Sequence, residues 1–344
     1  MARASCGCSG SLPVPIAAIG KLAGPAPALS TRLTWRDVLG GWRVRWGIGR
    51  MRYLISPGLY RVGAPDRQSP VLVTANYKLT IDAVRRELVG LNVWLLVLDT
   101  KGVNVWCAAG KGTFGTCELV RRMEAVKLAE VVDHRNLVLP QLGATGVAAH
   151  EVKRATGFSV RYGPVRARDI GAFLAAGMKA TPEMRRVTFG WKARLVLAPM
   201  ELSQTLKPAL LILAALTALY ALRHRTVGWH VAADFAPFLA AIFAGGVLTP
   251  LLLPWLPTRF AVKGAIAGAL CITATLIAFP GGAVETAGTA LLGAAIASYM
   301  GMMFTGSTTF TNLAGARLEV RHAMPAIVAS AGIGAALRVA GAFI

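Results

Sequence analysis

The chain has 344 residues, a formal net charge of +21 and 55% hydrophobic residues. Its mean hydropathy of +0.54 is too high for an ordinary soluble protein of this length. The positive charge raises the question of nucleic-acid binding, but the basic residues are scattered and no nucleic-acid-binding module is recognisable. A basic, apolar chain is more typical of a protein at a membrane, and we expect no nucleic-acid partner.

Charged residues divide the chain into a soluble part and a membrane part. Residues 1–200 hold 29 of the 37 Lys and Arg and 12 of the 16 Asp and Glu. Residues 201–344 hold the remaining eight and four. We therefore predict a flexible basic N-terminal extension over 1–54, a soluble domain over 55–200 and a transmembrane domain over 201–344.

The extension carries no apolar run that approaches a signal sequence or a membrane span. Four prolines between residues 13 and 27 interrupt any helix there. Cys6 and Cys8 form a C-x-C pair, but no second cysteine pair lies nearby to complete a metal site. We interpret these two cysteines as incidental thiols.

From residue 71 the pattern alternates between strands and helices. Strands are predicted at 71–74, 93–98, 137–139, 158–162 and 187–189, and helices at 80–88 (with Thr80 as N-cap), 116–132, 147–156 and 169–176. Repeated β–α units with short links predict an α/β fold, a doubly wound Rossmann-like parallel sheet. Ligands bind such sheets outside the carboxyl ends of the strands, which here means the loops at 74–76, 100–115, 141–146 and 162–166.

Five apolar segments follow, at about 206–222, 234–254, 261–279, 287–305 and 323–343. Each is long enough, or nearly so, to cross about 30 Å of hydrocarbon as a helix. Without a signal sequence, the soluble domain is expected in the cytoplasm, with the carboxyl terminus outside. Arg259, Lys263, Arg317 and Arg321 then lie in cytoplasmic loops, a modest positive-inside bias. We expect a multi-pass protein of the cell inner (plasma) membrane.

One cysteine stands out because of its surroundings, Asn104-Val105-Trp106-Cys107-Ala108-Ala109-Gly110-Lys111, just after the strand at 93–98. A thiolate is a soft ligand for a metal ion and a nucleophile. On a short helix Asn104 and Cys107 share a face, and Lys111 follows at the next turn. The small residues at 108–110 leave room for a flat group against the backbone.

This stretch resembles the cap-helix motif of the membrane corrinoid protein that methylates mercury in anaerobic microbes. More distantly, it and residues 162–170 and 196–202 resemble the corrin-binding domain of the corrinoid iron–sulfur protein of acetyl-CoA metabolism. Residues 305–311 resemble a loop of the mercury-methylation protein. The resemblance covers about 55–344, but the cluster cysteines and the barrel domain of the iron–sulfur protein are absent.

The resemblance implies a corrinoid (cobalamin) cofactor whose cobalt takes Cys107 as its lower axial ligand. The usual Asp-x-His-x-x-Gly signature of histidine ligation is absent. The residues expected to bind the cofactor, in addition to Cys107 itself, lie in the cap motif and in the sheet-edge loops: Thr74, Asn76, Asn104, Val105, Trp106, Ala108, Ala109, Gly110, Lys111, Gly143, Thr145, Gly146, Tyr162, Gly163, Pro164 and Val165.

The same resemblance implies an enzyme that transfers a methyl group from the corrinoid to inorganic Hg(II), forming methylmercury. A strongly donating thiolate opposite the methyl group favours its release to an electrophilic metal ion. The implied electron donor is a ferredoxin-like protein with two 4Fe–4S clusters. The methyl group is expected from a methylated folate through a separate methyltransferase.

Three alternatives remain open at this point. Cys107 could be a buried, inert cysteine beside a core tryptophan. The protein could be a membrane-anchored corrinoid methyl carrier with another acceptor. It could also be a non-enzymatic membrane sensor or transporter, although Asp234 and Arg338 are the main ionisable groups in the spans, which is poor support for a transport pathway.

Overall fold

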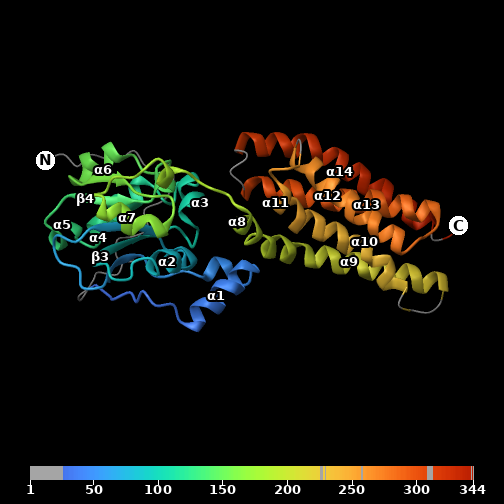
Figure 1. Ribbon diagram of the computed structural model, residues 1–344, viewed down its shortest axis with the longest axis horizontal. Helices are drawn as coiled ribbons and strands as arrows, with labels where there is room; N and C mark the ends of the chain where they lie inside the picture. Colours follow the sequence, from blue (N-terminus) through green and yellow to red (C-terminus); the bar gives the residue numbers. More distant parts are fainter. Residues whose placement is uncertain are drawn as a thin grey trace. The chain divides into compact units, whose positions relative to one another are not determined.

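The computed structural model describes residues 26–224, 228, 230–256, 259–307, 313–341 and 343. The chain divides into two compact units (Figure 1). The first comprises Ile48–Val187 and the described part of Met1–Val44, and the second comprises Arg45–Gly47 and Thr188–Ile344. The first unit is built on a sheet and the second is helical, so each is described by itself.

The first unit contains a five-stranded sheet with the order β1-β3-β2-β4-β5. Its strands are β1 (Gly58–Val62), β2 (Val71–Ala75), β3 (Val93–Leu98), β4 (Asn136–Leu139) and β5 (Ser159–Tyr162). β1 is antiparallel to β3, and the other pairs are parallel. The parallel strands are runs of branched apolar residues, as expected for a sheet that is buried on both faces.

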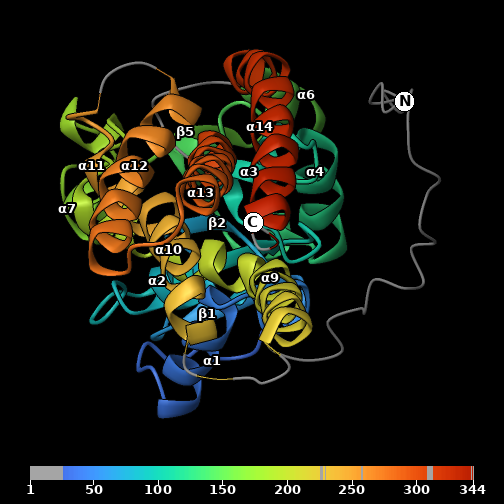
Figure 2. The same ribbon diagram turned by 90° about the vertical axis from the view of Figure 1, so that its right-hand side faces the viewer.

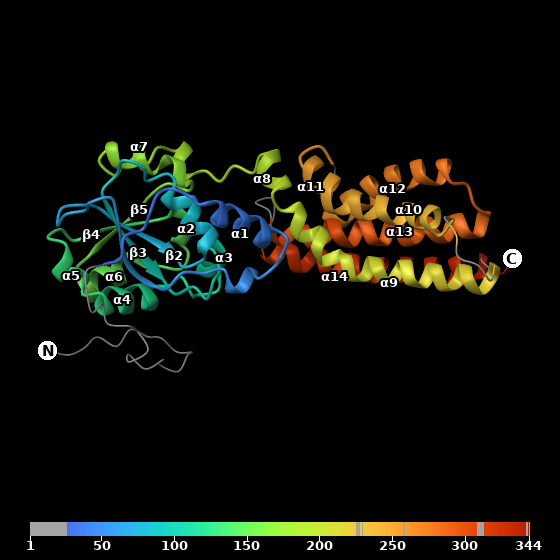
Figure 3. The ribbon, with the colours of Figure 1, turned by 90° about the horizontal axis from the view of Figure 1, so that it is seen from below.

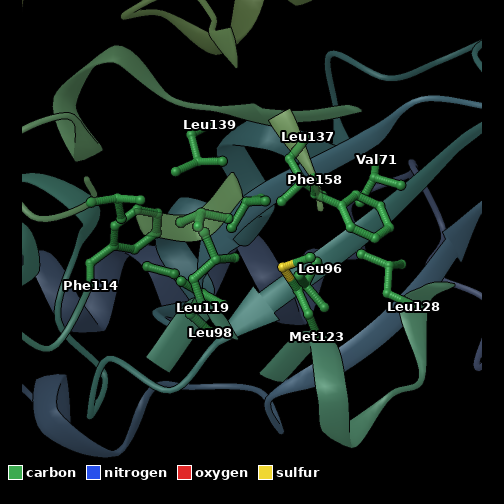
Figure 4. Close-up of a cluster of buried hydrophobic side chains, with 14 of the residues drawn as sticks. Val71, Leu96, Leu98, Phe114, Leu119, Met123, Leu128, Leu137, Leu139 and Phe158 are labelled. Carbon is green, nitrogen blue, oxygen red and sulfur yellow. The ribbon is translucent and has the colours of Figure 1, made fainter. Parts of the chain in front are cut away.

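Helices cover both faces of this sheet. They are α2 (Lys78–Arg85), α3 (Val105–Gly110), α4 (Thr116–Ala125), α5 (Leu128–Val131), α6 (Ala149–Thr156) and α7 (Ile170–Ala175). One core lies between the sheet and α3, α4, α5 and α6, and contains Leu96, Phe114 and Leu119 (Figure 4). A second core on the other face joins Leu95 to α2 and α7. Figure 3 shows α7 on one side of the strands and α4 and α6 on the other.

Four of the five predicted strands are present, with small differences in their ends. The expected strand at 187–189 is wrong, because these residues pair with no strand. Phe189 instead packs in an apolar cluster with Leu197 and Phe304 of the second unit. The antiparallel edge strand β1 was not predicted; it is a short alternating segment beside β3.

The predicted helix at 116–132 is broken into α4 and α5. Lys127 has a φ of 50°, the left-handed conformation that ends α4, and α5 begins at Leu128. Thr80 is not the N-cap of α2, because that helix begins at Lys78 and Tyr77 is the residue before it. Propensity placed this helix correctly, but it did not fix its first turn.

Residues 26–54 differ from the flexible extension that was expected. Ala28 bridges to Arg61 of β1, and α1 (Trp35–Arg45) follows. Asp37 on α1 forms salt bridges with Lys78 at 2.5 Å and Arg85 at 2.7 Å, both on α2. This part of the chain is therefore held against the α/β unit, whereas residues 1–25, with Cys6 and Cys8, lie outside the described residues.

The second unit is a set of long apolar helices. It contains α8 (Trp191–Leu195), α9 (Ala198–His224), α10 (His230–Phe243), a π-helical turn (Ala244–Leu248), α11 (Thr249–Leu252), α12 (Phe260–Ala278), α13 (Ala283–Met303) and α14 (Leu313–Gly341). Five stretches are long and apolar enough to cross a membrane: Trp191–Leu222, Val231–Leu252, Phe260–Ala278, Ala283–Met303 and Ala314–Gly341. Each of the five predicted segments falls largely within one of them. Part of the resembling loop at 305–311 lies outside the described residues.

Glycines let these helices approach closely. A Cβ on Gly264 of α12 would collide with the carbonyl oxygen of Ala297 of α13. A Cβ on Gly288 of α13 would lie 2.6 Å from the backbone nitrogen of Arg338 of α14. Such contacts between small residues are how helices pack in lipid, where the hydrophobic effect does not hold them together.

The charges expected in the spans pair with one another. Arg338 donates to Asp234 of α10 at 2.9 Å through Nη2 and to Glu285 of α13 at 2.9 Å through Nη1. Asp234 and Glu285 lie near the beginnings of their helices and Arg338 near the end of α14, so the cluster joins three helices at one end of the bundle. The pairing offsets the cost of placing these charges among apolar helices.

Candidate functional site

The predicted cap motif forms a short helix, α3, at the carboxyl edge of the parallel strands. Six residues separate it from the end of β3. Asn104 is its N-cap, and the Asn104 Oδ1 accepts a hydrogen bond from the backbone nitrogen of Cys107 at 2.9 Å. The cap satisfies one of the amides that a helix start leaves without a partner. The first turn, which contains Cys107, is thus fixed locally.

The two faces of α3 differ sharply in exposure. Val105, Ala108 and Ala109 are buried in the core beneath the helix, whereas Trp106, Cys107, Gly110 and Lys111 are exposed. The indole of Trp106 is 44% exposed and the Cys107 thiol is free. The alternative of a buried, inert cysteine beside a core tryptophan is therefore wrong. Cys107 is available to a ligand.

Asn76 positions the loop that leads into α3. Its Oδ1 accepts hydrogen bonds from the Thr100 nitrogen at 3.2 Å, the Thr100 hydroxyl at 2.9 Å and the Gly102 nitrogen at 3.1 Å. Its Nδ2 donates to Asp99 at 3.3 Å. Asn76 is 2% exposed and Thr74 is 3% exposed. Both were predicted to bind the cofactor, but their side chains are buried, and Asn76 acts by shaping the loop.

The loop after β4 packs directly under α3. A Cβ on Gly146 would collide with the carbonyl oxygen of Phe114 and lie 3.0 Å from Cα of Ala109, and a Cβ on Gly143 would lie 2.5 Å from the Phe114 ring. A side chain at Gly146 would thus meet backbone, and a side chain at Gly143 would meet the buried Phe114 ring, so neither position has room for one. Thr145 between them is exposed. Among the three predicted residues of this loop, Thr145 is the one with an exposed side chain.

The loop after β5 completes the edge. The Tyr162 hydroxyl donates to the carbonyl oxygen of Val147 at 2.6 Å, and the Gly163 nitrogen donates to Leu139 at 2.7 Å. Burial raises the pKa of Tyr162, so its hydroxyl stays protonated as a donor at neutral pH. Pro164 is buried, and the Val165 nitrogen donates to the carbonyl oxygen of Met184 at 2.8 Å. These four predicted residues form a framework that joins two loops.

Sequence reasoning missed Glu118, which is buried in the first turn of α4. Its Oε1 accepts from the backbone nitrogen of Asp99 at 2.9 Å and from Arg122 Nη2 at 2.6 Å, and its Oε2 pairs with Arg121. Burial acts to raise the pKa of the Asp99 carboxyl, but the hydrogen bonds and positive charge of Lys101 have the larger effect, so the pKa is lowered. The sequence did carry a signal for these ion pairs. An acidic residue stands in the first turn of a helix, and arginines follow it three and four positions later.

These elements together present one soft donor on a rigid support. Among the residues that the structure describes, no group of three or more His, Cys, Asp and Glu could hold a metal ion. A Cβ on Gly110 would meet no atom within 4 Å, so the space beside the exposed face of α3 is open. A free sulfur beside the open space at Gly110 fits a flat metal complex that takes one axial ligand from the protein.

Residues 51–174 match the family model of the CO dehydrogenase/acetyl-CoA synthase delta subunit. The gamma subunit of the acetyl-CoA decarbonylase/synthase complex of Methanopyrus kandleri is 39% identical over 123 residues, 35% of this chain and 26% of the subunit. The same subunit of Archaeoglobus fulgidus is 34% identical over 122 residues, with the same coverage. The corrinoid/iron-sulfur protein large subunit of Moorella thermoacetica is 33% identical over 122 residues, 35% of this chain and 27% of that protein.

The match thus covers the α/β unit with α3 at its edge. This chain spans about a quarter of the length of each of these relatives. The long apolar helices of the second unit lie outside the residues that the family model matches. The first unit is therefore a domain similar to part of these subunits, one of them the large subunit of a corrinoid/iron-sulfur protein, and it is joined here to a helical unit outside the matched residues.

Proposed function

We propose that this protein is a membrane-anchored corrinoid protein that carries a methyl group on Cys107-ligated cobalt. The observation that carries the proposal is the free, exposed thiol on α3, in a stretch where the chain is similar to corrinoid-protein subunits. We further propose that the first unit is a Rossmann-like, doubly wound domain. Its ligand then lies outside the carboxyl ends of β2 to β5.

In this proposal each part of the edge has its own role. A bound corrinoid supplies a cobalt that carries a methyl group, and a donating sulfur ligand favours release of that group to an electrophile. Cys107 holds the cobalt, and Asn104 holds Cys107 in place through the 2.9 Å hydrogen bond to its nitrogen. Trp106, Gly110, Lys111 and Thr145 are the predicted residues with exposed positions from which to contact the cofactor.

We propose inorganic Hg(II) as the methyl acceptor, so that the product is methylmercury and the protein is a methyltransferase. The support is the resemblance of the stretch from Asn104 to Lys111 to the cap motif of mercury-methylating corrinoid proteins. The proposed partners are a ferredoxin-like protein with two 4Fe–4S clusters, which returns cobalt to Co(I), and a folate-linked methyltransferase as the source of the methyl group. The five candidate spans support a multi-pass protein, and we propose the inner membrane with the α/β unit in the cytoplasm.

One competing function has support of its own. The relatives are subunits of acetyl-CoA decarbonylase/synthase complexes, which favours a methyl carrier with an acceptor other than mercury. A transporter is less well supported, because Arg338 and Asp234 are engaged with each other. Methylation assays with Hg(II) and with other soft acceptors distinguish the two corrinoid functions.

The experiment that tests the proposal is a visible spectrum of the full-length protein after anaerobic purification and incubation with cobalamin. Corrinoid absorption that co-elutes with the protein is expected. Its bands should shift when Cys107 is replaced by Ala, because the sulfur ligand is lost, while Cys271→Ala, which removes the free thiol of α12, should leave them unchanged. Absence of corrinoid, or identical spectra for all three proteins, would overturn the assignment of Cys107.

A further inference from the structure

A groove in the helical unit has no part in the proposed corrinoid chemistry. It lies between α12 and α14, and its volume is about 350 Å³. α14 packs extensively against α13 but touches α12 little, so α12 and α14 form the walls and α13 the floor. Figure 2 shows α13 between the other two helices. The groove is thus built within the second unit alone.

The groove has charged and polar side chains at one end and mostly small residues along the rest. Six of the lining residues are alanines, among them Ala265 of α12, Ala294 of α13 and Ala326 of α14, and two are serines, Ser298 and Ser330. At one end lie Arg259, Glu319 and His322. Glu319 closes this end, because its Oε1 accepts a hydrogen bond from the backbone nitrogen of Ala261 at 2.9 Å and so joins α14 to α12.

The size of the groove limits what can occupy it. One turn of α-helix, with a diameter of roughly 10–12 Å and a rise of about 5.4 Å, takes up roughly 400–600 Å³. A helix from a second protein therefore does not fit inside. A single hydrocarbon chain is thinner and matches the smooth alanine lining, and an apolar cavity of this volume is within the range that holds small amphiphiles.

The charges at the polar end favour an acidic headgroup. Arg259 is exposed at the N-cap of α12, and His322 is exposed on α14. The carboxylate of Glu319 is buried and already accepts from the Ala261 nitrogen. Arg317 and Arg321 lie in the first turns of α14, near the polar end of the groove, and add to the positive charge there. Guanidinium groups pair well with phosphate, and basic pockets between membrane helices bind anionic lipid headgroups.

We infer that this groove is a binding site for an anionic phospholipid. One acyl chain lies along the alanines between α12 and α14, and the phosphate meets Arg259 at the polar end. This assignment is independent of the corrinoid, since every residue involved belongs to the helical unit. It gives the membrane unit a specific lipid ligand rather than a general apolar surface.

Native mass spectrometry of the full-length protein in mild detergent tests this inference. Equal amounts of phosphatidylglycerol and phosphatidylethanolamine with the same acyl chains are added, and the lipid retained on the protein is measured. Phosphatidylglycerol should be retained preferentially. Arg259→Gln should lower that preference about fivefold, the factor that corresponds to about 1 kcal/mol for one basic residue at an anionic surface.

Two matched pairs make the test specific. Ala326→Leu fills the groove and should reduce retention of both lipids, whereas Ala336→Leu, at an exposed α14 position outside the groove lining, should not. Arg317→Gln removes a nearby exposed charge and should keep most of the preference for phosphatidylglycerol. Circular dichroism confirms that each variant keeps its helix content. Ala265→Leu fills the groove from the other wall and serves if Ala326→Leu misfolds.

Three results would overturn the inference. The first is no preference for the anionic lipid in the unaltered protein. The second is an equal loss of preference in Arg259→Gln and Arg317→Gln, which indicates surface charge alone. The third is a dimer that Ala326→Leu dissociates, which indicates that a second copy covers the groove.

Discussion

The side chain of Asn104 accepts a hydrogen bond from the backbone nitrogen of Cys107 at 2.9 Å, so the residue that begins α3 also fixes its sulfur-bearing turn. The helix has six residues, too few to be stable without such support. Three buried residues beneath it, Val105, Ala108 and Ala109, supply the rest. The exposed thiol is thus placed by a local cap and by the core beneath the helix.

Asn104→Ala should weaken corrinoid binding by about fivefold, because loss of an N-cap costs about 1 kcal/mol. Asn104→Asp should restore most of the affinity, since a carboxylate oxygen can accept the same hydrogen bond from Cys107. The measurement is titration of the full-length protein with cobalamin under reducing conditions. Equal binding by Asn104→Ala and the unaltered protein would show that the cap does not position the site.

Glycine positions beside α3 should separate packing from ligand access. Gly146→Ala should destabilise the domain, because its Cβ would collide with the Phe114 carbonyl and crowd Ala109. Gly110→Ala should leave folding intact, since its Cβ would meet no atom within 4 Å. A bulkier Gly110→Leu should still fold but bind less corrinoid, because the side chain occupies the open space.

Thermal unfolding and cobalamin retention, measured together, check this pair. The expected pattern is a lowered melting temperature for Gly146→Ala alone and reduced cobalamin retention with a normal melting temperature for Gly110→Leu. If Gly110→Leu binds cobalamin as well as the unaltered protein, the cofactor does not lie over this part of α3.

Four strands of the α/β unit, β2 to β5, and the cap helix could be predicted from the sequence because their signals are local. An apolar run such as Val93–Leu98, and the alternation of β and α segments, can be recognised without knowledge of the tertiary structure. The roles of Asn76 and Glu118 could not be predicted, because each acts on a loop distant in sequence, at Thr100 and Asp99. A polar residue at a strand end indicates a ligand and a structural brace equally well.

The N-terminal segment was harder to interpret for the same reason. Composition indicated a flexible tail, but Asp37 forms salt bridges with Lys78 and Arg85 on α2, over 40 residues later in the chain. The prediction of a strand at 187–189 was wrong because the apolar side chain of Phe189 packs among helices and its segment joins no sheet. In both cases the sequence showed the chemical character of the residue, but it did not show which distant residue that side chain contacts.

The docking of α1 should depend on pH through Asp37. Burial acts to raise the pKa of this carboxyl, but hydrogen bonds from Lys78, Thr34 and Arg85 outweigh burial and hold the pKa well below its ordinary value of 3.8. Because the folded-state pKa is lowered, Asp37 stabilises the docked segment fully above about pH 4. That contribution is lost as the pH falls toward the folded-state pKa.

Asp37→Asn should therefore increase hydrogen exchange in α1 about 30-fold at neutral pH, from a loss of about 2 kcal/mol in charge-assisted hydrogen bonds. The difference between this variant and the unaltered protein should shrink below pH 4. Glu124→Gln, at an exposed position of α4, should exchange normally and serves as the control. A difference that persists unchanged at pH 3 would exclude Asp37 as the titrating group.

The orientation of the membrane unit can be tested with reporter fusions. With five candidate spans, the proposed cytoplasmic α/β unit requires the link between α12 and α13 and the carboxyl terminus to lie on the outer face. Fusions at Gly282 and at the carboxyl terminus should both report outside, and a fusion at Arg259, before α12, should report inside. Opposite results at the first two positions would mean that one span, with 206–222 the first suspect, does not cross.

Replacement of Cys107 tests the proposed chemistry most directly. Cys107→Ala removes the exposed sulfur but leaves the buried face of α3, with Ala108 and Ala109, unchanged. The fold should survive, because an exposed position is altered and the Asn104 cap binds the backbone of residue 107. Corrinoid binding should persist at least weakly through the remaining contacts.

Methylmercury formation by Cys107→Ala should fall below detection, because no sulfur remains to donate electron density to the cobalt. Cys271→Ala removes the other free thiol described in the structure, on α12, and should retain activity close to that of the unaltered protein. The decisive measurement is methylmercury produced by the two variants at matched protein level, with the reducing partner and methyl donor supplied. Full activity in Cys107→Ala would rule out the thiolate-ligand mechanism, and activity toward another soft acceptor but none toward Hg(II) in the unaltered protein would favour the alternative methyl carrier.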